Sequence, residues 1–245
     1  METKSHRHFD LHVLGEVLGG KIGWMDMPQD GGRWLVLSGY ETYTEEAVEA
    51  LAGSVGEVEG LELEFRNLSV RAANALSTIK TFHVILPDLN SLSSNVAQCL
   101  RWPRGSEPIL AIGVDEQLSA SSALSLAKNC SGAPLEIAVP SIDADVAAAL
   151  AKHDHDLSLH IRGNHLSPEV GAVLAFHTGY AMTLEFDGPT TKDVMEALSR
   201  NPAKRTRQAA TPGWSRIYVV DHEMWCDFYE DDSFWATQPN QGGST

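Results

Sequence analysis

The chain has few cysteines and no long apolar run. Its 245 residues include only Cys99, Cys130 and Cys226, and no two of them form a CxxC pair. This excludes a disulfide framework and a zinc site built on closely spaced cysteines. No apolar run reaches the roughly 18 to 20 residues that a membrane helix needs. The N-terminal residues METKSHRHFDLHV also lack the apolar core of a signal peptide. We therefore expect a cytoplasmic protein with reduced thiols.

Basic residues are also scarce. The chain has 18 Lys and Arg against 33 Asp and Glu, which gives a formal net charge of −15. Nucleic acid and anionic membranes would repel such a chain, so neither is expected as its main ligand. The acidic balance fits a basic protein partner, although it can also serve solubility alone.

What the sequence does have is a repeat of about 24 residues. Residues 135–174 contain the same plan twice: an alternating apolar run with strand period, a turn, a capping residue and a short Ala/Val-rich helical pattern. Candidate helix N-caps recur at spacings of 24 to 26 residues: Thr44, Ser69, Ser93, Ser119, Asp143, Ser167 and Thr191. A leucine stands seven positions after every cap: Leu51, Leu76, Leu100, Leu126, Leu150, Leu174 and Leu198. Because a helix repeats every 3.6 residues, this leucine shares a face with the small or β-branched residue at position three.

The repeat predicts seven strands, each followed by a helix. The strands are expected near residues 35–38, 61–65, 82–86, 109–114, 135–139, 157–161 and 182–186. We expect them to pair in parallel and in sequence order, because one unit cannot bury its apolar face without neighbours. Around the repeats at residues 34–200 we expect an N-terminal cap (1–33), a linker and C-terminal cap (201–235) and a flexible tail (236–245). The aromatic and acidic C-terminal stretch is interpreted as a cap that includes a further strand at 217–220. The alternative is a peptide that docks on a partner.

These units resemble the leucine-rich repeat superfamily in its strand-plus-helix form. The segment Val58-x-x-Leu61-x-Leu63-x-x-Arg66-x-Leu68 follows the family frame L-x-x-L-x-L-x-x-N-x-L, and the resemblance covers about residues 34–200. The chain departs from the family at the Asn position, which is held by Arg66, Asp115, Pro140, Arg162 or Asp187. The family's ladder of Asn side chains is therefore expected to be absent. The repeats are most similar to the irregular, Ala-rich repeats of some bacterial proteins. The resemblance implies an α/β solenoid of about seven repeats plus caps, with a parallel sheet on the concave side and helices on the convex side.

In such a solenoid the polar strand residues would form the open concave surface. We predict a non-catalytic scaffold for protein–protein interaction, with no cofactor, whose acidic residues attract a basic partner. Apolar residues near the middle would supply the desolvated contact. The candidate partner-binding residues are Glu62, Glu64, His83, Ile85, Glu136, Ala138, His160 and Glu185.

The histidines of residues 153–165 give the alternative, a metal-dependent or hydrolytic enzyme. His153 and His155 would bind a divalent ion if the turn brought them together, with His160 and His165 nearby in the sequence. The competing interpretation is a solvated turn between helix and strand. The sequence contains neither G-x-S-x-G nor H-E-x-x-H, so no known catalytic motif supports the enzyme. Residues 15–22, GEVLGGKI, match a phosphate loop up to Ile22, where a Ser or Thr would hold magnesium. We interpret this match as chance.

Overall fold

The described strands form a single sheet in chain order. The structure is a computed structural model, and it describes residues 21–26, 33–38, 43–55, 57–100, 109–163, 166–179, 181–187, 191–200, 216–220, 224–227 and 238–239. The strands are β1 (Lys21–Asp26), β2 (Arg33–Ser38), β3 (Glu57–Leu63), β4 (Lys80–Leu89), β5 (Ile109–Val114), β6 (Leu135–Val139), β7 (Leu157–Ile161), β8 (Ala181–Phe186), β9 (Arg216–Val220), β10 (Met224–Asp227) and β11 (Gln238–Pro239). Neighbours from β2 to β9 pair in parallel, while β1, β10 and β11 join the ends of the sheet antiparallel. The predicted parallel pairing of the seven repeat strands is confirmed.

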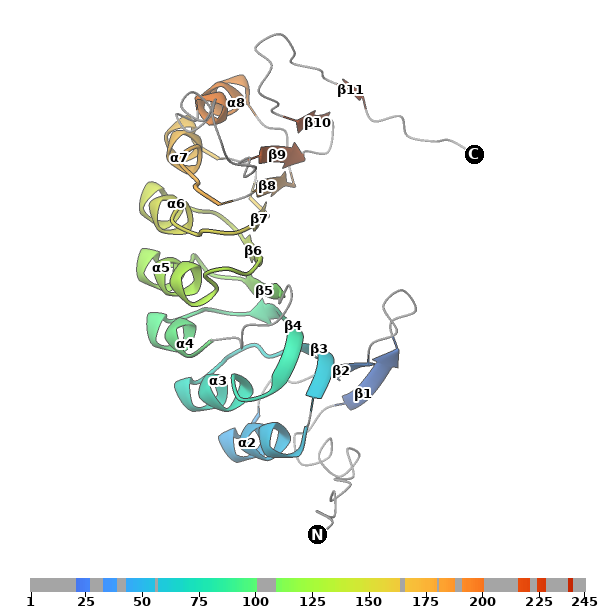
Figure 1. Ribbon diagram of the computed structural model, residues 1–245. Coiled ribbons are helices and arrows are strands. Elements are labelled where there is room, and N and C mark those ends of the chain that lie inside the picture. The colour runs from blue at the N-terminus through green and yellow to red at the C-terminus, as the bar shows by residue number, and fades with distance from the viewer. Residues whose placement is uncertain are drawn as a thin grey trace.

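One helix follows each strand from β2 to β8. The helices are α2 (Glu45–Ser54), α3 (Val70–Leu76), α4 (Ser94–Cys99), α5 (Ala120–Asn129), α6 (Ala144–Leu150), α7 (Pro168–Leu174) and α8 (Lys192–Ser199). Strands and helices make two layers of an arc, with the strands along its inner side and the helices along its outer side (Figure 1). The alternating strand–helix units are therefore present in one sheet.

Capping side chains begin the helices where the sequence predicts. Each of the seven predicted residues is an N-cap whose side-chain oxygen accepts a hydrogen bond from the backbone N–H three residues later, at distances from 2.8 to 3.4 Å. The leucine seven positions after each cap is 0 or 1% exposed. Each helix therefore presents its predicted face to the strand layer, and the core lies between the two layers.

Four of the seven predicted strands differ from their predicted bounds: β2 and β8 begin two residues and one residue earlier, and β3 and β4 differ more. β3 begins at Glu57 and ends at Leu63, four residues earlier and two residues earlier than predicted. β4 continues to Leu89, and its register with β5 shifts between Leu86 and Leu89. At this shift the carbonyl oxygen of Pro87 approaches Gly113 so closely that a Cβ there would lie 1.9 Å from it. Only glycine leaves room for that carbonyl, which explains how the irregular end of β4 packs against β5.

Charged residues stand at the Asn position of the repeat frame in several units, where they make backbone hydrogen bonds and ion pairs. The N–H groups of Asp115 and Arg162 donate at 2.8 Å to the last carbonyl of the preceding strand, in Leu89 and Val139. The Asp115 carboxylate also lies 3.1 Å from Nη1 of Arg66 and 3.1 Å from Nη1 of Arg162. Asp115 thus connects the turns that follow β3, β5 and β7.

The predicted caps lie mostly outside the described residues. β1 is the described part of the expected N-terminal cap, and β9, found at the strand predicted for residues 217–220, belongs to the expected C-terminal cap. Residues 15–20 of the phosphate-loop match, His165 and most of the flexible tail are outside the described ranges as well. The cap, linker and tail assignments therefore stay predictions.

Candidate functional site

The inner face is formed by the strand residues that alternate with the core. In β6, β7 and β8 buried and more exposed side chains alternate, so the positions between the buried ones face the other side of the sheet. β4 and β5 show the same alternation over residues 83–86 and 109–112. Strand register sets these positions in cross-strand rows. The central row contains Val36, Glu62, Ile85, Ala111, Glu136, Ser158 and Thr183. A second row contains Gly113, Ala138, His160 and Glu185. The described helices cover only the opposite, outer side (Figure 1).

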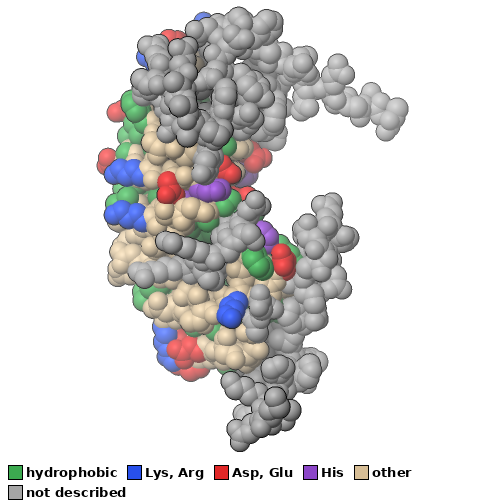
Figure 2. All heavy atoms as spheres, viewed as in Figure 1, with side chains coloured by type: hydrophobic (Ala, Val, Ile, Leu, Met, Phe, Trp, Pro, Cys, Tyr) green, Lys and Arg blue, Asp and Glu red, His purple; other side chains and the backbone are tan. Residues whose placement is uncertain are grey.

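All eight predicted partner-binding residues lie on this face or directly beside it. The two rows hold six of them: Glu62, Ile85, Glu136, Ala138, His160 and Glu185. His83 lies on β4 opposite Gly60, and Glu64 directly follows β3. Val84 and Leu86 are fully buried, so the predicted outward facing of His83 and Ile85 is confirmed. In the view of Figure 2, histidine and acidic side chains are seen towards the inner side of the arc, and both acidic and basic side chains are seen along its outer side.

One end of the inner face carries interacting carboxylates. Burial of the half-exposed Glu62 raises the pKa of its carboxyl, and the negative charges of Glu64 and Asp88 raise it further. Every one of these contributions opposes ionisation. A cation placed against Glu62 would relieve this penalty, so this end of the sheet suits a positively charged ligand.

An aromatic pair lies beside these carboxylates. The rings of Trp34 on β2 and His83 on β4 stack with centroids 5.5 Å apart and planes 9° apart. Gly60 is the β3 residue between them in register, and a Cβ at Gly60 would lie 2.2 Å from the Trp34 ring. Sequence reasoning missed Trp34. Its signal was Gly60, a glycine inside a strand, which often marks a close approach of another group.

At the other end, His160 is oriented by a carboxylate. Its Nε2 lies 2.8 Å from Oδ1 of Asp187, and the imidazole is about one-third exposed at 36%. A histidine held in this way is suited to general-base chemistry, which also needs a nucleophile within reach. Among the described residues no serine, threonine or cysteine hydrogen-bonds this ring. In the part of the chain that the structure describes, His160 is thus an oriented imidazole with no hydroxyl or thiol nucleophile bonded to it.

His153 has a structural environment on the helix side of the sheet. It is 0% exposed, with Nδ1 3.3 Å from the carbonyl oxygen of Ala127 and Nε2 3.0 Å from that of Ala133. Burial lowers the pKa of this imidazole. The solvated-turn interpretation is therefore wrong for His153, although the adjacent Asp154 is exposed. Its ring nitrogens face carbonyl oxygens, so they do not converge with His155 on a metal.

The position of His153 is repeated in neighbouring units. Asn129, His153 and His177 each stand three residues after the invariant leucine. The amide nitrogen of Asn129 donates to Ala97 O and Gln98 O in the last turn of α4, at 2.9 and 3.0 Å. His177 is 1% exposed, and burial lowers the pKa of its imidazole to about 4. In the units of Asn129 and His153 the side chain thus bonds the end of the preceding helix, which accounts for His153 without a metal.

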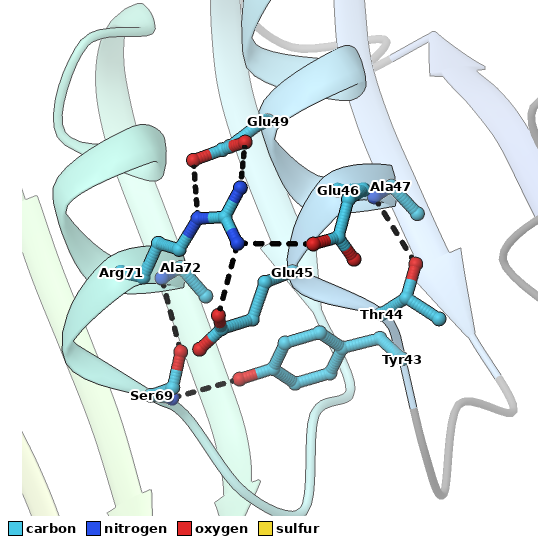
Figure 3. A network of polar contacts seen from close by, with 9 residues as sticks. All are labelled: Tyr43, Thr44, Glu45, Glu46, Ala47, Glu49, Ser69, Arg71 and Ala72. Atoms are coloured by element: carbon cyan, nitrogen blue, oxygen red, sulfur yellow. Dashed lines mark hydrogen bonds and ion pairs between the residues drawn. The ribbon is translucent and has the colours of Figure 1, made fainter.

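The outer side offers an open groove between α2 and α3. Arg71 on α3 donates to both carboxylate oxygens of Glu49 at 2.7 and 2.6 Å, and to Glu46 and Glu45 at 3.0 and 3.4 Å (Figure 3). The Arg71 hydrogen bonds lower the pKa of the Glu49 carboxyl. Because this guanidinium is already engaged by three carboxylates, the groove is better explained as helix packing than as an anion site.

Other chemistry is limited in the described part of the chain. Burial raises the pKa of the Cys130 thiol to about 12, which keeps it protonated and unreactive. The described residues contain no group of three or more His, Cys, Asp or Glu placed to hold a metal ion. They also contain no helix with the length and apolar character needed to cross a membrane.

In comparisons with protein-family models, curated proteins and solved structures, nothing matches this chain. Its function must be argued from the geometry of its own residues.

Proposed function

We propose that this chain is a leucine-rich-repeat-like solenoid that acts as a non-catalytic cytoplasmic scaffold. It binds a basic protein partner through the inner face of its sheet. The observation that carries the proposal is the inner face itself, where one row of residues crosses seven consecutive strands on the side opposite the described helices. A continuous face of this kind is the surface that repeat proteins use for partners.

The charges on the face support a basic partner. Glu62, Glu136 and Glu185 stand on three different strands, so their negative field extends across the sheet. Glu62 and Glu136 are three strands apart, or roughly 14 Å. Such a field raises the rate at which a positively charged protein associates, and salt screens it over about 8 Å at physiological ionic strength. The apolar stretch between them, Ile85 and Ala111, supplies the contact that excludes water.

A charge-reversal experiment tests this function. The tagged protein is used to capture partners from the lysate of its source at low and high salt, and the association rate of a captured basic protein is then measured. We expect Glu64→Lys with Glu136→Lys to lower this rate by about ten-fold at low salt, because association with a basic partner is electrostatically steered. We expect Ile85→Asp to act mainly on the dissociation rate, since it disrupts a desolvated contact.

The matched control places the same charge change on the outer side. Asp145 on α6 and Glu169 on α7 are both exposed, and neither belongs to the inner face. Asp145→Lys with Glu169→Lys should change the association rate by less than about two-fold. Equal losses in the two double variants would mean that only net charge matters, and binding without salt dependence would remove the electrostatic basis of the proposal.

Elemental analysis separates the scaffold from the metal-dependent alternative. We expect protein purified without chelator to contain no stoichiometric divalent metal, because the ring nitrogens of His153 face carbonyl oxygens. One equivalent of bound metal that disappears in His155→Ala would favour the enzyme instead.

A further inference from the structure

The first end of the inner face combines aromatic rings with carboxylates. Trp34 and His83 stack across Gly60, and both side chains remain partly exposed. Any larger residue than glycine at position 60 would displace the indole, since a Cβ would lie 2.2 Å from it. The absence of a side chain at Gly60 therefore lets the indole of Trp34 stack on the ring of His83. We call this stacked pair the Trp34–His83 platform.

The carboxylates lie in the next cross-strand row of residues, further along the strands. Glu62 follows Gly60 by two residues on β3, which is about 7 Å along a strand and on the same face. It lies in register with Val36 and Ile85, so its carboxylate is flanked by apolar side chains. Glu64 and Asp88 add their negative charge at the same end. The platform and the carboxylates thus lie within reach of a single extended side chain.

A guanidinium fits both parts of this surface. It is planar, it stacks on aromatic faces, and it donates parallel hydrogen bonds to a carboxylate. An ammonium group is compact and strongly hydrated, so it gains less from a half-buried carboxylate beside apolar groups. We propose that the Trp34–His83 platform and Glu62 form a subsite for an arginine side chain of the partner. The inference rests on the proposed function and adds which cation the inner face selects.

Two peptides of equal charge provide the test. Fluorescein-labelled nona-arginine and nona-lysine are titrated with the full chain at pH 7.5, in 0.05 and 0.15 M NaCl, and binding is followed by anisotropy. We expect nona-arginine to bind roughly three- to ten-fold more tightly than nona-lysine, the gain expected from stacking on an aromatic platform. Trp34→Leu should reduce arginine-peptide binding to the lysine level and leave lysine-peptide binding unchanged.

Conservative variants distinguish the loss of the arginine subsite from a loss of folding. Trp34→Phe retains a ring and should retain most of the preference for arginine. Glu62→Gln should weaken both peptides, whereas Glu185→Gln, the same change on β8, should leave the preference intact. In the unmutated protein the ring protons of His83 should shift in NMR spectra on addition of nona-arginine and stay in place with nona-lysine.

The outcomes distinguish this inference from the function on which it rests. A preference for arginine that survives Trp34→Leu overturns the subsite, as does an unchanged His83 signal. If both peptides then still bind with salt dependence and weaken in Glu62→Gln, the acidic inner face remains supported. If neither peptide binds in 0.05 M NaCl, the subsite and the basic partner both fail.

Discussion

The N-cap side chain is the single-residue feature that fixes where each helix begins. Thr44, Asp143 and Ser167 are chemically different caps, yet each accepts the N–H three residues later. This interaction depends only on local sequence, because cap and donor belong to the same turn. For that reason all seven caps were predictable without knowledge of the tertiary structure.

Side chains that act across units were not predictable in the same way. His153 appears in the sequence as part of a charged turn, but the structure buries it against carbonyl oxygens of Ala127 and Ala133. The one available signal was its position, three residues after the invariant leucine, which it shares with Asn129 and His177. Because this position is Asn in one unit and His in two others, the pattern of residue types does not reveal that the side chains share a position in the fold.

His177 should make the protein sensitive to acid. Its folded pKa is about 4, against an ordinary value of 6.5. Below pH 6.5 the unfolded chain binds this proton more readily, so stability is complete above that pH and falls as the pH decreases towards 4. The loss should approach about 3 kcal/mol, since one pKa unit corresponds to about 1.4 kcal/mol. Urea denaturation at pH 7.5, 6, 5 and 4.5 measures it.

The variant His177→Asn isolates this contribution. It should be less dependent on pH than the unmodified protein, with the difference confined to the window between pH 6.5 and 4. Comparing the two proteins cancels groups with the opposite sign, such as Glu62, whose raised pKa favours the folded state in acid. Equal slopes for His177→Asn and the unmodified protein would contradict the prediction.

At the scale of elements, the strand–helix unit depends on one buried leucine. Leu150 on α6 is 0% exposed and packs in the core between the strand and helix layers. Leu150→Ala should lower the free energy of unfolding by about 2 to 5 kcal/mol, the range for buried leucine truncations. Leu124→Ala removes the same atoms from a half-buried site on α5 and should cost clearly less. Chemical denaturation of both variants tests this, and a change below about 0.5 kcal/mol for Leu150→Ala would show that the buried face is misassigned.

The elements themselves were largely predictable, and their irregularities were not. Strand period and helix period alternate clearly in residues 135–174, so β6 and β7 match the predicted ranges and their helices begin after the predicted caps. The extension of β4 past Pro87 depends on a contact with Gly113, which lies on the next strand. The link from Asp115 to Arg66 and Arg162 likewise depends on register. Long-range register cannot be derived from a pattern of residue types alone.

Asp115 provides a prediction for these turns. Its ion pairs with Arg66 and Arg162 are partly exposed, at 34 to 47% of each side chain, so solvent screens them. Asp115→Asn should therefore lower the free energy of unfolding by no more than about 1 kcal/mol, with a smaller effect at high salt. A loss above about 2 kcal/mol in chemical denaturation would show that the charged link, rather than the backbone hydrogen bonds, holds the turns together.

At the scale of the whole molecule, the sequence located the inner face but not its organisation. Strand alternation was enough to place Glu62, Glu136 and Glu185 on the side away from the core. It did not show that Glu62 and Glu136 share one row while Glu185 lies in another, because a row is a property of strand register. The stacking of Trp34 on His83 was missed for the same reason, since the two rings come from strands separated by β3.

A chain of stacked units should also unfold in a position-dependent way. Among the described helices α2 has only α3 as a neighbour, whereas α6 packs between α5 and α7. Leu51 on α2 and Leu150 on α6 are both 0% exposed, so truncating them to alanine removes equally buried atoms. In a one-dimensional array an inner unit supports both neighbours, while an end unit can open alone. We therefore expect Leu150→Ala to shift one cooperative transition, and Leu51→Ala to release residues 43–55 early with a smaller loss of global stability. Hydrogen exchange measured on peptides from both regions across a urea series separates the two behaviours, and uniform loss of protection in Leu51→Ala would mean that the sheet unfolds as one body.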